Sequence, residues 1–427
     1  MIALALVACR PPPAAAPTPR EAPPPRLAIA PPREPEPPLA VGSLERPAAL
    51  ARFFAALARL ESGAATDDVR VVQLGDSHTA ADWQTGPMRR QLQARFGDGG
   101  RGFVPIGLPW KAWSQEGVLE GTAGAWSTQM TALHSRQPGG DGVFGLSGFA
   151  LASRQGGSRA WIDVLATTSR AELYYLEQPG GGSFDLVVDG VRSRVATRAE
   201  ARRSAFHAVE LSAATRHRIE ARALGDGEVR LFGLALDRAE QHGLVLDALG
   251  INGARVATAL SWNEAHFTEQ LRHRAPELVI LAYGTNDAID VETSLDAFEA
   301  DAAAAALRIA RAAPSSSCLL LGPPDRANKS GDGWRTPARL VEIVARERKV
   351  AHAAGCAFYD QLAAMGGEGA MARWATEAYP RGQPDRVHLS RQGYADLATA
   401  FVTDLQRAYD QWRSATQELR DLRLSER

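Results

Sequence analysis

A serine, an aspartate and a histidine of this chain have the types and spacing of a nucleophile with its general base. Ser77 lies between a β-branched run at 69–74 and a predicted helix at 80–96, where backbone N–H groups can surround an oxyanion. Asp385 and His388 lie three residues apart near the C-terminus. A serine hydroxyl needs a base to take its proton and a carboxylate to orient that base. We therefore predict that Ser77, His388 and Asp385 meet in one site that hydrolyses esters.

The surroundings of Ser77 separate this chain from the standard α/β-hydrolase fold. No G-x-S-x-G elbow surrounds the serine, although the order serine, aspartate, histidine is the one that fold uses. Asp76 directly precedes Ser77, and we expect it to brace the loop by accepting hydrogen bonds from backbone N–H groups. The remaining histidines show no metal-ligand spacing, so no metal is predicted.

Four short blocks in this chain stand in the order used by SGNH/GDSL hydrolases. They are Gly-Asp-Ser77, Gly253, Gly-Thr-Asn286-Asp and Asp385-x-x-His388. The chain resembles this family over 65–115 and 240–412. The resemblance implies a flavodoxin-like, three-layer α/β fold with a parallel sheet, and it implies no metal or organic cofactor.

By the same resemblance, three groups donate hydrogen bonds to the oxyanion: the backbone N–H of Ser77, the backbone N–H of Gly253 and the side-chain amide of Asn286. Two of these residues also fit simpler roles. Gly253 has the position of a turn residue, and Gly250 competes for its role as a donor. Asn286 has the position of a turn residue or of a cap.

Features near the first block resemble the bacterial peptidoglycan O-acetylesterase branch of the family. Ser77 is followed by His78 where leucine is common, then by Ala-Asp-Trp83, and a glycine-rich loop ends in Phe-Val-Pro105. That branch carries an inserted β-sandwich similar to a carbohydrate-binding module. Trp83 and Trp110 are candidates for stacking on sugars, with packing as the alternative. Asp325 is a candidate for lining the cleft or for capping a turn.

The predicted elements divide the chain into an interrupted hydrolase domain. Short alternating runs indicate an inserted antiparallel β-sandwich over 113–238, which we expect to be jelly-roll-like. Its six predicted strands lie at 161–165, 171–176, 184–188, 206–211, 217–223 and 229–236. A helix at 44–60, capped by Ser43, is predicted before the first strand. After the sandwich, strands and helices alternate again, as in a parallel sheet covered on both faces, with helices predicted at 256–272, 295–312 and 338–354 and a strand at 357–359. The predicted segments are 1–9 as a truncated signal and lipobox, 10–42 as a Pro-rich linker, 43–112 and 239–412 as the two hydrolase parts, 113–238 as the sandwich, and 413–427 as a tail.

The N-terminus matches a bacterial lipobox, Leu-Val-Ala-Cys9, in which the cysteine is lipidated. The eight residues before Cys9 are too few for a signal peptide, so we expect the true start upstream; the alternative is an accidental match. Half of the 26 prolines fall in 11–38, as in a semi-rigid spacer, or else in a disordered tail without an anchoring role. We expect a lipid-anchored, periplasmic protein of the bacterial cell envelope.

Charge and cysteine content narrow the partners further. A net charge of −1, from 48 basic and 49 acidic residues, argues against nucleic acid. Three cysteines cannot form an extensive disulfide framework, and Cys318 and Cys356 are predicted to be small core residues on buried strands.

These observations favour a serine esterase that removes O-acetyl groups from a cell-envelope polysaccharide, with peptidoglycan as the leading substrate. The alternatives on the same site are a lipase, a thioesterase or an acetyltransferase. An alternative from another class is a non-catalytic glycan-binding protein with a relic hydrolase domain. The intact Ser77, Asp385 and His388 count against a relic.

Overall fold

The computed structural model describes residues 42–110, 113–137, 139–212 and 216–425, with side chains up to Glu418. The described residues belong to one compact unit. Cys9, and all of the predicted Pro-rich linker except Gly42, lie outside the described residues. The predictions of a lipobox and a spacer therefore stay predictions.

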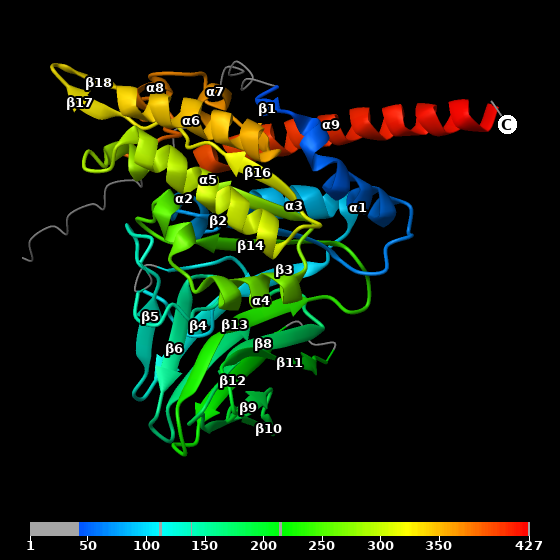
Figure 1. The fold of residues 1–427 in the computed structure, drawn as a ribbon, viewed down its shortest axis with the longest axis vertical. Coiled ribbons are helices and arrows are strands. Elements are labelled where there is room, and N and C mark those ends of the chain that lie inside the picture. The colour runs from blue at the N-terminus through cyan, green and yellow to red at the C-terminus, as the bar shows by residue number, and fades with distance from the viewer. Residues whose placement is uncertain (1–41, 111–112, 138, 213–215, 426–427) are drawn as a thin grey trace, which may run out of the picture. The chain divides into compact units, whose positions relative to one another are not determined.

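A mostly parallel sheet organises the hydrolase part of the chain (Figure 1). Its six strands, in spatial order, are β1 (Leu44–Glu45), β19 (Ala357–Tyr359), β16 (Ser317–Leu321), β15 (Leu278–Ala282), β2 (Val69–Gly75) and β14 (Leu244–Gly250). All neighbouring pairs are parallel except β1 with β19. In chain order, the five parallel strands run 2-1-3-4-5, which is the flavodoxin-like order. The predicted fold class is confirmed.

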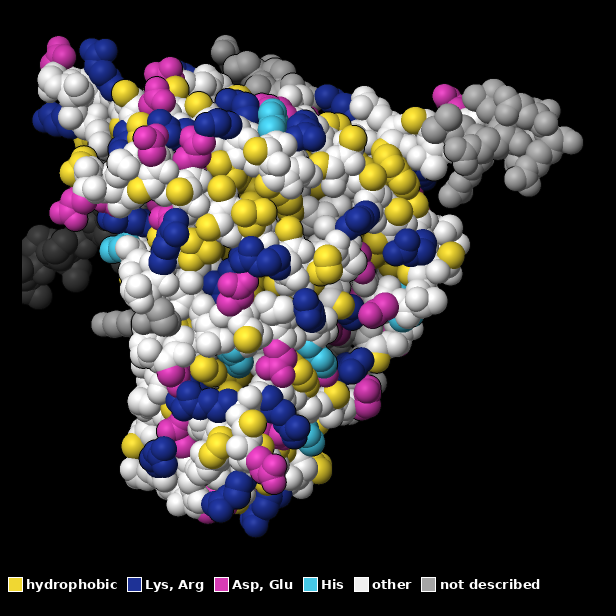
Figure 2. All heavy atoms as spheres, viewed as in Figure 1, with side chains coloured by type: hydrophobic (Ala, Val, Ile, Leu, Met, Phe, Trp, Pro, Cys, Tyr) yellow, Lys and Arg dark blue, Asp and Glu magenta, His cyan; other side chains and the backbone are white. Residues whose placement is uncertain are grey.

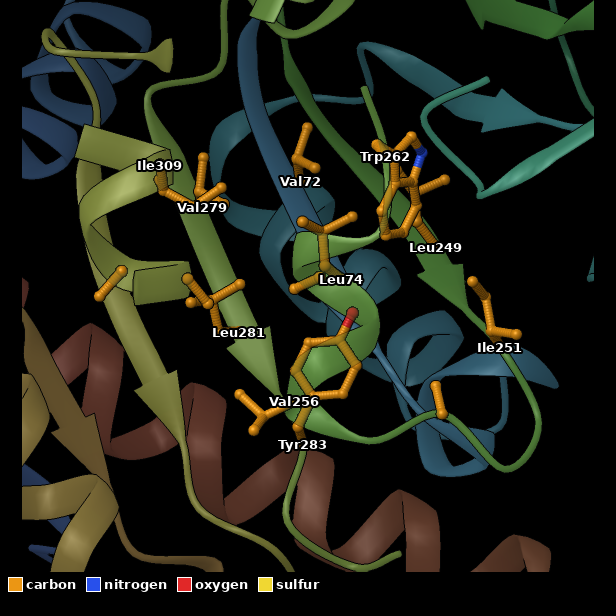
Figure 3. Packing of buried hydrophobic residues seen from close by; sticks show 14 of the residues in the cluster. Val72, Leu74, Leu249, Ile251, Val256, Trp262, Val279, Leu281, Tyr283 and Ile309 are labelled. Carbon is orange, nitrogen blue, oxygen red and sulfur yellow. The ribbon is translucent and has the colours of Figure 1, made fainter. Parts of the chain in front are cut away.

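Helices cover both faces of this sheet because the strand side chains alternate between two cores. Val71 points into one core and Val72 into the other. The first core packs under α1 (Ala51–Glu61), α3 (Thr85–Phe96) and α9 (Arg391–Ser425), and the second under α4 (Glu264–Arg274), α5 (Leu295–Ala312) and α6 (Ala338–Ala354). Figure 3 shows part of the second core, where Leu74 of β2 lies between Leu249 of β14 and Leu281 of β15.

Two antiparallel sheets form the β-sandwich. One contains β4 (Val118–Ala123), β7 (Arg159–Val164), β12 (His217–Ala223), β9 (Ser183–Val188) and β10 (Val191–Ala196). The other contains β5 (Ser127–Met130), β6 (Phe149–Ser153), β13 (Val229–Asp237), β8 (Arg170–Glu177) and β11 (Arg203–Glu210), and β3 (Gly100–Val104) pairs with β13. A separate hydrophobic core fills the space between them. The six strands predicted in this region are present; β4, β5, β6 and β10 were not predicted.

The glycine-rich segment after α3, which was predicted to be a loop, contains the strand β3. β3 pairs with β13 of the sandwich, and its Phe103 N–H donates to Asp247 Oδ1 of β14 at 2.7 Å. A Cβ at Gly100 would lie 2.6 Å from Asp237 Cα, so glycine permits the close approach. This strand thereby joins the sandwich to the central sheet.

Three predicted helices are interrupted. The segment at 44–60 begins with β1 and the 3₁₀ turn η1 (Pro47–Leu50) before α1, and Ser43 does not cap it. The segment at 80–96 divides into α2 (Ser77–Ala80) and α3, because Asp82 adopts a left-handed φ of 58° between them. The segment at 256–272 divides into η2 (Val256–Leu260) and α4, which Asn263 caps.

Two of the cysteines lie in or against the hydrophobic core, as predicted, but they are also bonded to each other, which was not predicted. Cys318 and Cys356 form a disulfide, with their Cα atoms 4.9 Å apart. Cys318 lies on β16, and Cys356 directly precedes β19, which pairs with β16 through Leu319 and Ala357. Neighbouring parallel strands therefore hold the two sulfur atoms side by side at their amino-terminal ends. The sequence does not reveal which strands are neighbours.

Candidate active site

The nucleophile stands directly after β2, where the chain turns sharply into α2. Asp76 caps this short helix: its Oδ1 accepts a hydrogen bond from the His78 N–H at 2.9 Å. Asp76 is 1% exposed, and burial raises its pKa to about 7. A Cβ at Gly75 would lie 2.8 Å from the carbonyl oxygen of Ala282, so only glycine fits the turn. Asp76 thus has the bracing position expected for it, beside Ser77.

The structure brings the predicted nucleophile, base and acid together. Ser77 Oγ lies 2.9 Å from His388 Nε2, and His388 Nδ1 lies 2.7 Å from Asp385 Oδ2. These distances are within hydrogen-bond reach. With Nδ1 donating to the carboxylate, Nε2 can accept the proton of Ser77. The three side chains thus have the geometry of a catalytic triad.

A tight turn holds the acid and the base in register. Arg386 adopts a left-handed φ of 56°, which folds the chain so that Asp385 Oδ1 accepts from the N–H groups of Val387 at 2.9 Å and His388 at 3.0 Å. Burial alone would raise the pKa of Asp385. The hydrogen bonds from the His388 side chain and from these N–H groups hold its pKa below the usual value, so the carboxylate stays charged.

The predicted oxyanion donors lie on loops that leave three adjacent strands at the same end. Gly75 of β2 is in register with Gly250 of β14 and Ala282 of β15, so the loops carrying Ser77, Gly253 and Asn286 start side by side. The Asn286 Nδ2 donates to the carbonyl oxygen of Ala254 at 2.9 Å, which fixes the amide beside Gly253. Such fixed donors can stabilise a tetrahedral intermediate.

Two further residues shape this donor loop. Asp287 accepts from the N–H of Gly284 at 3.2 Å and from that of Val256 at 3.3 Å, so its carboxyl joins the loops after β15 and β14. Gly253 has a left-handed φ of 79°. Gly250, its competitor, ends β14, and a Cβ there would lie 2.6 Å from the Asp76 carbonyl oxygen. Close packing therefore explains Gly250 without a role as donor.

A second histidine lies behind the triad. His78 is buried, its Nδ1 lies 2.9 Å from the hydroxyl of Tyr394, and its ring centroid is 5.4 Å from that of His388. Burial, and then the charge of His388, lowers the pKa of His78 to about 3, so this imidazole is neutral at pH 7. In the sequence, His78 stands out only as a departure from leucine, and nothing there indicates its contact with Tyr394.

The inserted sandwich reaches the oxyanion loop, a contact that the sequence does not predict. In the connection between β5 and β6, the carbonyl oxygen of Leu133 accepts from the Arg255 N–H at 3.2 Å and from the hydroxyl of Thr258 at 2.5 Å. His134 Nε2 lies 3.2 Å from the carbonyl oxygen of Gly253. The sandwich is therefore a structural support of the site.

The three residues proposed for substrate contact differ in how much of their side chains solvent can reach. Trp83 is half-buried, has its ring 5.9 Å from that of Tyr394, and lines a pocket of about 320 Å³ with Arg391. Trp110 packs against the sandwich core. Asp325 is fully buried, and its carboxylate accepts from the Met371 N–H at 2.8 Å. Asp325 has no exposed surface with which to line a cleft.

The described residues contain neither a metal site nor a membrane-spanning helix. No group of three or more His, Cys, Asp or Glu side chains there is arranged to hold a metal ion. In the same part of the chain, none of the helices is both long and apolar enough to cross a lipid bilayer.

Comparisons with known proteins agree with this geometry. Residues 212–395 match the GDSL-like Lipase/Acylhydrolase family, a range that includes Gly253, Asn286, Asp385 and His388 and begins after Ser77. No curated protein sequence matches the chain. One similar solved structure is a peptidoglycan O-acetylesterase: it is 24% identical, the alignment covers 87% of this chain and all of that one, and the TM-score is 0.72.

Two other solved structures are less similar. A family two carbohydrate esterase from Cellvibrio japonicus is 14% identical over 69% of this chain and 99% of that one, with a TM-score of 0.27. An acetyl-xylooligosaccharide esterase from Geobacillus is 22% identical over 38% of this chain and 73% of that one, with a TM-score of 0.29. Both TM-scores are too low to support a structural argument. The family match, the triad and the flavodoxin-like sheet point the same way: residues 212–395 of this chain are similar to the GDSL-like lipases and acylhydrolases, and its fold is similar to that of a peptidoglycan O-acetylesterase.

Proposed function

We propose that this protein removes O-acetyl groups from a polysaccharide of the bacterial cell envelope. The observation that carries the proposal is the chain of contacts from Ser77 Oγ through His388 to Asp385, at 2.9 and 2.7 Å. A serine activated in this way attacks acyl carbonyl groups. An acetylated sugar presents such a carbonyl on an exposed hydroxyl of the polymer.

The reaction proceeds in two halves. His388 Nε2 takes the proton of Ser77 as Oγ attacks the acetyl carbonyl, and the amide of Asn286 and the N–H groups of Ser77 and Gly253 receive the oxyanion. His388 then gives its proton to the sugar oxygen, which leaves as a hydroxyl. Water, deprotonated by His388, attacks the acetyl-enzyme and releases acetate and free Ser77.

Peptidoglycan is the substrate that we propose first. The support is the solved peptidoglycan O-acetylesterase whose fold matches over 87% of this chain, with the whole of that chain covered. At 24% identity the match speaks for the fold, and the choice of polymer stays a proposal. The sandwich, which is hydrogen-bonded to the oxyanion loop through the carbonyl oxygen of Leu133, offers a second surface for the polymer.

Acetate release from defined polymers tests the proposal. Purified protein is incubated with O-acetylated peptidoglycan, with acetylated xylan and with p-nitrophenyl esters of rising chain length, beside a Ser77→Ala variant. We expect acetate from peptidoglycan, a preference for acetyl over longer acyl groups, and no turnover by the variant. Turnover that rises with chain length would favour a lipase or thioesterase. Acetyl transfer to an added sugar would favour a transferase. Activity that survives the loss of Ser77 would refute the mechanism.

We further propose that the protein works in the periplasm, anchored through a lipidated Cys9. The disulfide between Cys318 and Cys356 supports an oxidising compartment, because cytosolic thiols are kept reduced. Membrane fractionation of cells expressing the full chain from its natural start tests the anchor. We expect wild type in the membrane fraction and Cys9→Ala in the soluble fraction; an unchanged distribution would contradict lipidation.

A further inference from the structure

A small hairpin stands beside the catalytic loop at the active edge of the sheet. Strands β17 (Asn328–Ser330) and β18 (Gly333–Arg335) follow β16, just as Ser77 follows β2 and Asn286 follows β15. Loops after parallel strands meet at the carboxyl edge of the sheet, where ligands bind in open α/β folds. In Figure 1 the hairpin projects on the same side of the sheet as α2. It is therefore placed to meet a polymer that reaches Ser77.

The base of the hairpin is tied to the triad loop. The Ala327 N–H donates to the carbonyl oxygen of Arg386 at 2.9 Å, directly beside Asp385. The guanidinium of Arg386 lies over the ring of Trp334, 4.0 Å from its centroid. A cation stacked on one face of an indole fixes the orientation of the ring. Trp334 is thus held in place next to the acid of the triad.

Trp334 leaves much of its surface in solvent. Figure 2 shows that apolar side chains also reach the surface elsewhere on this face of the molecule, mixed with charged ones. All nine tryptophans lie within the described residues, and Trp334, at 39% exposure, is the most exposed of them. Exposed aromatic rings backed by rigid partners are typical of contact surfaces, because a flat apolar face gains from covering another flat surface. The C–H face of a pyranose ring is such a surface.

Positive charge surrounds this indole. Lys329 is the cross-strand partner of Trp334, so both side chains lie on the same face of the hairpin. Neither Lys329 nor Arg386 forms an ion pair with an acidic residue in the described part of the chain, whereas Lys349 pairs with Glu299 at the surface of α5 and α6. The Arg386 Nε is buried without a hydrogen-bond partner. The acidic residue of the hairpin, Asp332, lies in its turn.

We propose that Lys329, Trp334 and Arg386 form a subsite for a carboxylate-bearing sugar residue of the acetylated glycan. This inference rests on the proposed function and names the class of its substrate, an anionic glycan. The exposed face of Trp334 stacks on the sugar ring, and the ammonium of Lys329 and the guanidinium of Arg386 pair with its carboxylate. Cations beside the triad that pair with no acidic residue in the described part of the chain favour an anionic polymer over a neutral one such as xylan.

Three variants separate the subsite from the chemistry: Trp334→Ala, Trp334→Tyr and Lys329→Gln. We expect kcat/KM for p-nitrophenyl acetate to stay within about twofold of wild type in all three, because this ester is too small to reach the subsite. On soluble O-acetylated peptidoglycan fragments, Trp334→Ala should lose about tenfold in kcat/KM, mainly through KM. Trp334→Tyr should keep most of the activity, because it retains an aromatic face.

The lysine variant tests charge. Lys329→Gln should raise KM for the anionic fragments about threefold and weaken the dependence of KM on salt, while activity on acetylated xylan stays unchanged. Lys349→Gln, which removes an equivalent charge from α6, is the matched control and should change neither substrate. Binding of the inactive Ser77→Ala protein to the same glycan, with and without Trp334→Ala, measures the subsite without turnover.

The outcomes distinguish the subsite from the proposed function. Equal losses of kcat/KM on the small ester and on the glycan would show that the hairpin supports the triad. Wild-type activity of Trp334→Ala and Lys329→Gln on the glycan would show that the hairpin does not contact the glycan. Either result overturns the subsite and leaves the esterase intact. If the wild-type enzyme cleaved p-nitrophenyl acetate but released acetate from no envelope glycan, the proposed function would be overturned. The subsite is tested separately: if Trp334→Ala bound the glycan as tightly as the protein that keeps Trp334, the subsite would be overturned.

Discussion

The side-chain amide of Asn286 donates a hydrogen bond to the carbonyl oxygen of Ala254 at 2.9 Å. This contact ties the loop after β15 to the loop after β14. It uses one hydrogen of the amide and leaves the second free to point at an oxyanion. The donor is therefore oriented before the substrate arrives, which is the condition under which such a group accelerates a reaction.

We expect Asn286→Ala to lower kcat for p-nitrophenyl acetate by about 10²–10³, with KM changed little, because the lost donor acts mainly on the transition state. Steady-state kinetics beside a thermal unfolding curve check this. A variant with normal kcat would show that Asn286 only links the two loops.

We expect Asp385→Asn to lower kcat on the order of 10⁴ without loss of fold. Asparagine can still accept the N–H groups of Val387 and His388 through one oxygen, so the turn survives. The amide cannot accept from His388 Nδ1 and stabilise the imidazolium as a carboxylate does. Kinetics and circular dichroism measure the two effects, and a loss under tenfold would contradict the triad assignment.

The buried carboxyl of Asp287 should make stability depend on pH. Burial raises its pKa to about 7, whereas an aspartate in the unfolded chain titrates near its usual value of 3.8. The folded state therefore favours the protonated form: this stability is complete below about pH 4 and is lost as the pH rises through about 7. When the pH rises from 5 to 8, the free energy of unfolding should fall in wild type by roughly 2 kcal/mol more than in Asp287→Asn.

Urea unfolding at the two pH values measures the difference for Asp287→Asn. Asp296→Asn, at a carboxylate whose side chain is 90% exposed, is the control and should follow wild type. If the wild-type and Asp287→Asn unfolding free energies changed with pH in parallel, the carboxyl of Asp287 would not titrate between pH 5 and 8, and the prediction would be wrong.

Removal of the disulfide should lower stability and spare activity. Closing a loop of 38 residues restricts the unfolded chain, and replacing both Cys318 and Cys356 by alanine should cost about 4 kcal/mol of unfolding free energy. The bond lies at the amino-terminal ends of β16 and β19, opposite the edge that carries Ser77, so kcat should be unchanged. Urea unfolding with and without a reductant checks the stability, and steady-state kinetics of wild type and variant check kcat. An effect of the reductant on the stability of the variant would show that another group is involved.

Local patterns predicted much of the fold correctly. The strand at 357–359 and the helices at 295–312 and 338–354 have the predicted bounds, because each shows an uninterrupted period of apolar residues. The prediction of one continuous helix at 80–96 was wrong, because the helix is interrupted at Asp82, whose buried carboxylate binds Arg89 and Arg101. Apolar periodicity does not register a break that distant charged partners stabilise.

The contacts of the sandwich were also beyond sequence reasoning. Leu133 meets the oxyanion loop through its backbone carbonyl group, which carries no residue-specific signal, and the side chain of His134 meets the carbonyl oxygen of Gly253. Trp334 could have been noticed as a tryptophan in a glycine-rich turn, but its exposure and its stacking on Arg386 exist only in the folded chain.

The sequence by itself determined the chemical groups of the site and the order in which they occur, because nucleophile, base and oxyanion donors are residue types placed at strand ends. Only the tertiary structure decided which strands are neighbours. That choice sets the 2.9 Å between Ser77 and His388, the pairing of Cys318 with Cys356 and the support of Gly253 by the sandwich. Distances between remote residues depend on how the layers pack, and packing is a property of the whole chain.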